Sequence, residues 1–391
     1  MKPHRLELAD VFRTHQRAFL ARWNSVLSRQ QRKALRDIRD CRTAVLGGHL
    51  YECDRCGHRV KVFNSCRNRT CPKCQATARA KWLAQREAEL LPVPYFHVVF
   101  TLPQQIGRLA LQNQKQIYSI LFQTASQTLL TIAADPKHLG ASIGFLAVLH
   151  TWGQNLHLHP HLHCVVPGGG FSPDGSRWIA CRKHSFFLPY KVLSRLFRRL
   201  FLLSLGKAFR KGQLRLSGEL RDLAKPDTFQ ALCETTAHLE WVVHVKPPFG
   251  GARRVLKYLA RYTHRVAISN HRLRTLENGR VSFDWKDYAD HSRTKTMSLD
   301  AIEFIRRFLL HVLPSGLVRI RHFGFLANRV RRQKLVQCRA LLAASQPPIP
   351  LDSDDPTTSV EDPLCCPICK RGRLIVIELL SAETIAVQDS S

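Results

Sequence analysis

Apolar side chains recur at helical spacing through the first 50 residues. Leu8, Val11 and Phe12 fall on one face of a helix with a period of about 3.6 residues. Ser28 and Gln31 have the spacing of a capping box, so a second helix is expected to begin there. The pattern therefore predicts that the chain starts with helices.

After residue 90 the pattern changes to short apolar runs bounded by turn residues, which is typical of β-strands. Residues 145–152 and 161–166 are such runs, and the polar segment between them can turn, so we expect neighbouring antiparallel strands. The other predicted strands are 94–103, 240–245, 265–269 and 280–287, with Asn278-Gly279 as a hairpin signal. The predicted helices are 104–134, 193–203 and 252–264.

The last third of the chain is basic and then polar. Asp300 and Glu303 cap a predicted helix that Pro314 ends. Residues 319–339 hold seven Lys or Arg and no Asp or Glu. Residues 346–363 are rich in Pro, Ser, Thr and Asp, as linkers are, and a short tail with cysteines follows.

Composition adds a strong positive charge. The 391 residues include 60 Lys and Arg against 29 Asp and Glu, for a formal net charge of +31. Because basic surfaces attract polyanions and release their counterions, nucleic acid is the expected partner, with a basic ribosome-associated or membrane-surface protein as the alternative. At 45% hydrophobic residues the chain can build a full core, which excludes wholesale disorder.

Neither export nor a membrane span is predicted. The N-terminal residues alternate charged and bulky side chains, unlike the apolar core of a secretory signal. The uncharged stretch 116–134 includes 8 Gln, Ser or Thr residues, which would lack partners in hydrocarbon. We therefore expect a cytoplasmic protein without membrane contact.

Thirteen cysteines, several in CxxC pairs, favour metal over disulfides in a reducing compartment. Four thiolates at such spacing can close a tetrahedron around zinc, and a closed site without a position for water serves folding. Cys66 and His58 lie in the same segment and are alternative ligands. The predicted structural zinc ligands are Cys53, Cys56, Cys71 and Cys74.

Two basic groups are candidates for contact with nucleic acid. They are Arg67, Arg69 and Lys73 beside the predicted zinc site, and Arg329, Arg331, Arg332 and Lys334 in the basic segment. Around the zinc site, the alternative is a zinc-stapled scaffold with incidental charge.

Histidines alternate with other residues from position 157 to 163. Side chains two apart on a strand share a face, so His161 and His163 can point together at one metal ion. Two imidazoles leave coordination positions for phosphate oxygens, as a catalytic site requires. Pro160 breaks the alternation, which makes His159 the expected third ligand; His157, Gln154 and Glu240 are alternatives.

Tyr258 and Tyr262 are four residues apart, so they lie on one helix face, where the alternative is an ordinary apolar stripe. A phenol with a pKa of about 10 is almost fully protonated at neutral pH and needs help to act as a nucleophile. Arg261 and Arg265 supply positive charge nearby. No ATP site is predicted, because residues 170–176 place Ser176 where a phosphate-binding loop requires Lys, and Pro173-Asp174-Gly175 is a turn.

Together these residues resemble the rolling-circle transposases of bacterial insertion sequences, the two-tyrosine branch of the HUH endonucleases. The resemblance covers most of the chain in order and rests on these blocks: NSCRNRTCPKCQ, YFHVVFTLP, LHTWGQ, HPHLHCVVPGGG, KPPFGG, YLARYTHRVAISN, FDWKDY and RHFGFLANRVRRQKL. It implies an α+β fold, in which helices flank a central antiparallel sheet that carries the histidines. The implied domains are a helical zinc-binding and DNA-binding domain at 1–90, a catalytic domain at 91–290, a basic helical extension at 291–345, and a linker with tail at 346–391.

The resemblance also implies a chemistry. Mg²⁺ or Mn²⁺ on His161 and His163 would polarise a phosphate of single-stranded DNA at a transposon end or target. Tyr258 or Tyr262 would attack phosphorus and leave a 5′-phosphotyrosine, with Arg261 and Arg265 stabilising the transition state. Cys366 and Cys369 look like a terminal zinc knuckle of the family. The expected location is the bacterial nucleoid.

Two alternatives to a transposase stay open. A replication initiator or conjugative relaxase would use the same histidines and tyrosines. A zinc-containing DNA-binding relative without catalysis would keep the basic surface alone.

Overall fold

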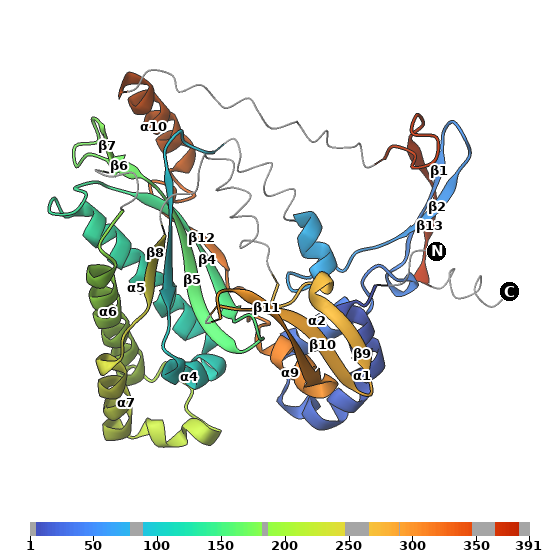
Figure 1. The fold of residues 1–391 in the computed structure, drawn as a ribbon, viewed down its shortest axis with the longest axis horizontal. Coiled ribbons are helices and arrows are strands. Elements are labelled where there is room, and N and C mark those ends of the chain that lie inside the picture. Colours follow the sequence, from blue (N-terminus) through green and yellow to red (C-terminus); the bar gives the residue numbers. More distant parts are fainter. Residues whose placement is uncertain are drawn as a thin grey trace. The chain divides into compact units, whose positions relative to one another are not determined.

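The computed structural model describes residues 5–78, 89–181, 187–246, 266–288, 290–345 and 364–382 (Figure 1). The chain divides into two compact units. Unit 1 comprises Met1–Thr77, Ile268–Leu309 and Ile349–Ser391, and unit 2 comprises Ala78–Ala267 and Leu310–Pro348. Across the described ranges, no helix is long and apolar enough to cross a membrane.

Unit 2 is built on an antiparallel sheet, as expected for an α+β fold. Its five described strands run in the order β12-β4-β5-β3-β8. Their bounds are Ile320–Gly324 for β12, Gly144–Trp152 for β4, Leu158–Pro167 for β5, Tyr95–Thr101 for β3 and Val243–Lys246 for β8. The predicted antiparallel pair at 145–152 and 161–166 is confirmed as β4 and β5.

One face of this sheet packs against helices. Alternate residues of β3 and β5, such as Phe100 and Leu162, join a core that also contains side chains of α5 (Gln114–Ala134) and α6 (Tyr190–Arg210) (Figure 1). The rings of Phe100 and Phe197 meet edge to face, with centroids 4.9 Å apart. Because side chains alternate between faces along a strand, the residues between these core positions point to the opposite face.

Smaller elements complete unit 2. They are α4 (Gly107–Gln112), α7 (Pro226–His238), α10 (Arg331–Ser345), β6 (Gly169–Phe171) and β7 (Trp178–Ala180), with 3-10 turns at Gln104–Ile106 and Gly218–Ala224. β6 and β7 form a hairpin. In its turn, the Asp174 carboxylate accepts hydrogen bonds from the Ser176 hydroxyl at 2.6 Å and the Ser176 N–H at 3.2 Å. The turn predicted at Pro173-Asp174-Gly175 is confirmed.

Unit 1 combines N-terminal helices with a distant part of the chain. Its helices are α1 (Leu8–Trp23), α2 (Arg29–Arg39) and α9 (Ala301–Leu310), with 3-10 turns at Asn24–Val26, Ala44–Leu46 and Asn270–Arg272. Phe12 of α1 meets Phe308 of α9 at 5.7 Å between ring centroids. The Ser28 hydroxyl accepts from Gln31 N–H at 3.2 Å, which confirms the predicted capping box.

A three-stranded antiparallel sheet in unit 1 has the order β11-β10-β9, with β9 at Leu273–Glu277, β10 at Arg280–Asp287 and β11 at Arg293–Asp300. Asn278 and Gly279, both with positive φ, form the turn between β9 and β10. The predicted strand at 265–269 is wrong, since residues 266–269 are not in a strand. A two-residue turn pairs β10 with the residues directly before it, so Arg280 faces Glu277.

The other sheet of unit 1 has the order β13-β1-β2. β1 (Gly48–Cys53) and β2 (Arg59–Phe63) form a hairpin near the N-terminus, and β13 (Leu374–Leu380) comes from the C-terminal tail. Both neighbours of β1 run antiparallel to it. This sheet therefore joins segments of the chain that are more than 300 residues apart.

Candidate functional site

Three histidines converge on the face of the unit 2 sheet opposite the helices. His161 and His163 are two residues apart on β5, and His150 on β4 lies directly across from His161. Cross-strand partners point to the same face. One ring nitrogen of each histidine lies within 4.8 Å of those of the other two.

A hydrogen bond to the backbone fixes the tautomer of His161. Its Nδ1–H donates to the backbone oxygen of His159 at 2.6 Å, so its Nε2 carries the lone pair. That Nε2 lies 3.0 Å from Nε2 of His163. Two nitrogens bound at right angles to one ion at about 2.1 Å are about 3.0 Å apart. The spacing fits two imidazoles that share a divalent ion.

His97 on β3 supports His163 from behind. Its Nε2 lies 2.8 Å from Nδ1 of His163, and the two rings stack with centroids 5.0 Å apart. Burial, with the nearby charge of Lys246 adding to it, lowers the pKa of His97 to about 3. A neutral His97 can accept the Nδ1–H of His163, which directs Nε2 of His163 toward the centre of the group.

The connection between β4 and β5 is held by another buried histidine. Nδ1 of His311 accepts from the Thr151 hydroxyl at 3.2 Å, and its Nε2–H donates to the Leu156 backbone oxygen at 3.1 Å. Leu156 has a φ of 63°, a conformation that needs such support. Burial lowers the pKa of His311 to about 4. Trp152 stacks on His150 at 4.6 Å. These contacts fix the loop and His150 together.

The structure brings His161 and His163 together and places His150, rather than the expected His159, beside them. His159 is exposed and contributes its backbone oxygen to His161, whereas His150 supplies the third imidazole. The physical reason is that His159 lies at the exposed start of β5, where its backbone oxygen accepts from the His161 ring, and its own ring nitrogens are not among those that converge. His150 lies in the predicted partner strand, so counting the register back from the turn was the signal that could have found it.

Four predicted site residues lie outside the residues that the structure describes. They are Tyr258, Tyr262, Arg261 and Arg265.

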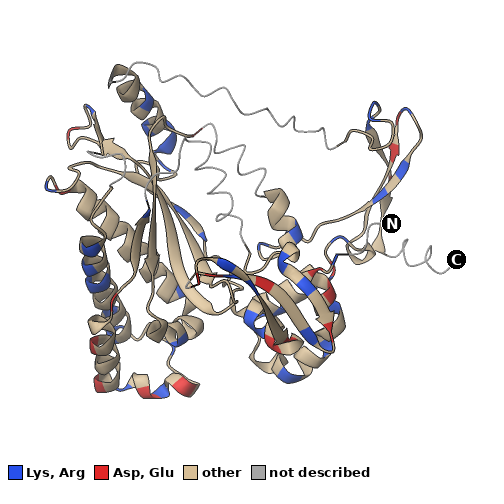
Figure 2. Ribbon diagram, viewed as in Figure 1, with Lys and Arg blue, Asp and Glu red and all other residues tan. Residues whose placement is uncertain are grey.

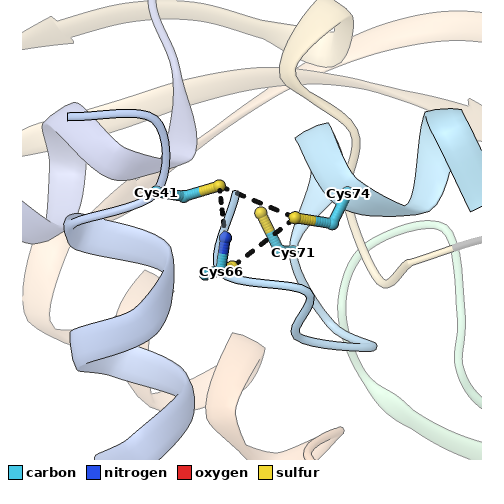
Figure 3. Close-up of side chains that lie close together, drawn as sticks. All are labelled: Cys41, Cys66, Cys71 and Cys74. Atoms are coloured by element: carbon cyan, nitrogen blue, oxygen red, sulfur yellow. Dashed lines mark hydrogen bonds between the residues drawn. The ribbon is translucent and has the colours of Figure 1, made fainter. Parts of the chain in front are cut away.

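A first cysteine group contains Cys41, Cys66, Cys71 and Cys74 (Figure 3). Sγ of Cys74 lies 3.6 Å from Sγ of both Cys41 and Cys66. At a Zn–S length of about 2.3 Å, two sulfurs of a tetrahedron are about 3.8 Å apart, whereas a disulfide has about 2.05 Å. The Cys66 N–H points at Cys41 Sγ at 3.5 Å. The sulfur spacing fits zinc.

A second cysteine group contains Cys53, Cys56, Cys366 and Cys369. Sγ of Cys53 lies 3.7 Å from that of Cys369, and Sγ of Cys56 lies 3.6 Å from that of Cys366. Backbone N–H groups of Arg371 and Gly372 lower the pKa of Cys369 to about 6 and favour its thiolate.

The predicted single site of Cys53, Cys56, Cys71 and Cys74 is therefore wrong as a set. Each CxxC pair finds another partner: Cys71 and Cys74 meet Cys41 and Cys66, while Cys53 and Cys56 meet the tail. The β1-β2 hairpin separates the two pairs, because Cys53 ends β1 and the chain returns through β2. Cys66 was among the alternatives, but Cys41 stands alone in the sequence and carried no signal.

The predicted basic contacts differ in their surroundings. Arg67, Arg329 and Arg332 are exposed, whereas Lys73 forms an ion pair with Glu7 at 2.5 Å and Arg331 approaches Glu89 at 3.4 Å. Lys334 lies over the ring of Phe171, 4.7 Å from its centroid. Burial lowers the pKa of Arg69. Figure 2 shows further Lys and Arg along α6 and α10.

An antiparallel sheet with convergent imidazoles, thiol groups spaced for zinc, and a strongly basic surface are features of a DNA-processing enzyme. Comparison with known proteins agrees. Residues 144–334 match the family described as putative transposase, and residues 11–102 match a transposase zinc-binding domain of the IS91 type.

Whole-chain relatives are transposases as well. The chain is 55% identical over 386 residues to the putative transposase y4qJ of Sinorhizobium fredii, which covers 97% of this chain and 96% of that protein. It is 29% identical over 355 residues to the transposase for insertion sequence element IS801 of Pseudomonas savastanoi pv. phaseolicola, covering 88% and 83%. The chain therefore belongs to the IS91/IS801 family of transposases, which is of the rolling-circle type.

Among solved structures, the chain is similar to the conjugative relaxase TrwC in complex with oriT DNA. The likeness has 13% sequence identity and a TM-score of 0.24, and it covers 43% of this chain and 71% of that one. At this TM-score it carries no argument about activity.

Proposed function

We propose that this transposase nicks and rejoins single-stranded DNA by tyrosine transesterification assisted by a divalent ion. The observation that carries the proposal is the convergence of His150, His161 and His163 on one point of the sheet. Membership of a rolling-circle transposase family supports it, because transposition of this type requires strands to be cut and joined.

The three imidazoles would hold Mg²⁺ or Mn²⁺. Such an ion polarises a non-bridging oxygen of the scissile phosphate and makes phosphorus easier to attack. Three protein nitrogens leave coordination positions for phosphate oxygens. The chain's own contribution is orientation: the His159 backbone oxygen fixes the tautomer of His161, and His97 fixes that of His163.

Tyr258 or Tyr262 would be the nucleophile. Its phenol oxygen forms a bond to phosphorus as the bond to the 3′-oxygen breaks, and the phenol proton is balanced by the proton that the leaving 3′-hydroxyl gains. The product is a 5′-phosphotyrosine with a free 3′-hydroxyl. Because the phosphodiester energy is kept in the covalent bond, rejoining needs no ATP. Arg261 and Arg265 would stabilise charge on the transition state.

Exposed basic residues would bind the phosphates of transposon-end and target DNA. Arg67 in the zinc-binding domain, with Arg329 and Arg332 before and in α10, are exposed and suited to this role. If six or more phosphates are contacted, affinity should fall by about a thousandfold or more between roughly 50 and 200 mM salt. A salt-independent affinity would contradict the assignment of the partner.

The test is a cleavage assay on labelled single strands that carry the end of the protein's own element. The wild type, Tyr258→Phe, Tyr262→Phe and the double variant would be compared in the presence of Mn²⁺. We expect cleavage by the wild type and its loss in the double variant, with DNA binding unchanged. Peptide mapping of the product should find a nucleotide adduct on Tyr258 or Tyr262.

Two results would contradict the proposal. Cleavage by the double variant, or an adduct at neither tyrosine, would remove the tyrosine mechanism. DNA binding without cleavage in every variant, including the wild type, would instead favour a non-catalytic relative.

A further inference from the structure

The second cysteine group joins segments of chain 310 residues apart, from Cys56 to Cys366. Half of its thiols lie in the C-terminal tail, outside the zinc-binding domain matched at residues 11–102. The first cysteine group lies wholly inside that domain. The second group is thus a separate feature of the chain.

We propose that Cys53, Cys56, Cys366 and Cys369 bind a zinc ion of their own, and that this ion fastens strand β13 of the tail to strand β1 of the zinc-binding domain. The C-terminal tail is then folded into unit 1 and is not a separate segment that follows the linker. This inference does not depend on the proposed nuclease chemistry.

The turns of the two CxxC pairs share an equivalent backbone hydrogen bond. Gly57 N–H donates to the Cys53 backbone oxygen at 3.1 Å, and Lys370 N–H donates to that of Cys366 at 2.9 Å. Gly57 and Lys370, each four residues after the first cysteine of its pair, have φ values of 69° and 54°. Each pair therefore forms the same knuckle, and two such knuckles together supply four sulfurs to a tetrahedral ion.

Direct contacts hold the knuckles face to face. The Asp54 N–H donates to the Arg373 backbone oxygen at 3.1 Å, and the Arg373 N–H donates to Oδ1 of Asp54 at 2.8 Å. A side chain at Gly372 would collide with Sγ of Cys53 and Oδ1 of Asp54. Glycine is the residue that permits this approach, and its N–H points at Cys369 Sγ at 3.3 Å.

Apolar packing does little to hold the tail. On β13, Ile375, Ile377 and Leu379 are 53%, 48% and 73% exposed, and Leu380 is the one residue of the strand that is buried, at 4%. Backbone pairing in a small sheet with so little buried area is marginal in water. A metal ion bound by both knuckles would attach the tail to the zinc-binding domain, which the small buried apolar area of β13 does not do.

The sulfur distances exclude disulfides as the alternative link. Both cross-segment distances, 3.6 and 3.7 Å, fit a tetrahedron around zinc and are far from the roughly 2.05 Å of an S–S bond. Cys365 next to the group is not a member, since its Sγ approaches the backbone oxygen of Cys366. It provides a matched control.

The first test counts zinc in the purified full chain by elemental analysis and native mass spectrometry. We expect two zinc ions per chain in the wild type and in Cys365→Ser, and one in Cys366→Ser/Cys369→Ser. Cys71→Ser/Cys74→Ser should also retain one, from the second group. One zinc in the wild type, or two in Cys366→Ser/Cys369→Ser, would overturn the proposal.

The second test asks whether zinc holds the tail. A protease recognition sequence placed within residues 346–363 allows the full chain to be cut under native conditions, with an affinity tag at the C-terminus. The wild-type and Cys365→Ser tails should stay bound after cutting and leave on addition of a chelator. The tail of Cys366→Ser/Cys369→Ser should leave at once. If the cut tail stays bound in the presence of the chelator and also in Cys366→Ser/Cys369→Ser, zinc does not attach the tail to unit 1.

Discussion

The histidine group in unit 2 and the second cysteine group in unit 1 both hold donor atoms within 4.8 Å of one another, yet they are built in opposite ways. The histidines project from β4 and β5, whose other faces carry fully buried residues such as Leu149 and Leu162. The cysteines lie at strand ends and turns, beside a tail strand that is mostly exposed.

The difference shows what places the ligands in each case. In unit 2 a hydrophobic core fixes the strands, the strands fix the imidazoles, and the group exists whether or not a metal binds. In unit 1 little apolar area holds the tail, so metal binding and folding are expected to be one event there.

Removal of zinc should disrupt the cysteine segments and spare the sheet of unit 2. Structural zinc contributes on the order of 10 kcal/mol to the folding free energy of small domains. Other interactions within these short cysteine-bearing segments could not make up for that loss. Hydrogen exchange of the full chain with and without a chelator would measure this. We expect protection to be lost in β1 and β13 and kept in β3, β4 and β5. Equal loss of protection in both regions would contradict the expected difference between them.

Acid should weaken unit 2 through His311. Its pKa is about 4 in the folded state and about 6.5 when unfolded, so the unfolded state binds the proton first as the pH falls. Neutral His311 makes its full contribution to the free energy of unfolding above about pH 6.5. As the pH falls to about 4 this contribution is lost, which lowers the free energy of unfolding by up to about 3 kcal/mol. Urea unfolding at several pH values would measure it.

The control for that experiment is His311→Gln, whose amide can make the same two hydrogen bonds without titrating. The difference in unfolding free energy between this variant and the wild type should shrink or reverse in favour of the variant as the pH falls. A difference that does not change with pH would contradict the role of His311.

Replacement of His150 should remove most of the metal-dependent cleavage. Loss of one of three ligands is expected to slow the initial rate by at least about 100-fold, since even outer partners of metal ligands matter by 10-fold or more. His159→Ala is the matched control, because it removes an exposed ring and keeps the backbone oxygen that accepts from His161. The nicking rate on labelled single strands decides: similar losses in both variants would argue against His150 as a ligand.

His97→Leu should reduce affinity for Mn²⁺ by about 10-fold or more, because the Nδ1–H of His163 would lose its acceptor. His97→Gln should restore part of the affinity, since its amide oxygen can accept the same bond. Calorimetric titration of the full chain, with zinc already bound, measures both variants. An unchanged affinity in His97→Leu would mean that the sheet alone orients His163.

The smallest effect concerns the knuckle turns. Lys370 occupies a left-handed conformation that costs a non-glycine residue about 1 kcal/mol, so Lys370→Gly should strengthen tail attachment by up to about that amount. Gly57→Lys places the same cost in the other knuckle and should weaken it. The chelator concentration needed to release the cut tail should be highest for Lys370→Gly, intermediate for the wild type and lowest for Gly57→Lys. The reverse order would contradict the equivalence of the two knuckles.

Elements with strong local signals could be predicted from the sequence. The β4-β5 pair, the capping box at Ser28 and the pairing of His161 with His163 on one face all follow from periodicity over a few residues. Such signals do not depend on parts of the chain far away.

Features that depend on long-range pairing could not be read in this way. The split of the CxxC pairs depends on β13 reaching β1. Cys41, which has no cysteine within its own turn, becomes a member of a group only when α2 packs near the segment at 66–74. Spacing along the chain carries no information on these contacts.

The most direct test of the prebuilt histidine site is Mn²⁺ bound to the full chain and observed by pulsed electron paramagnetic resonance. We expect nitrogen couplings from three imidazoles in the wild type and in His159→Ala, and from two in His150→Ala. A spectrum without imidazole couplings, or one that His150→Ala leaves unchanged, would contradict this expectation.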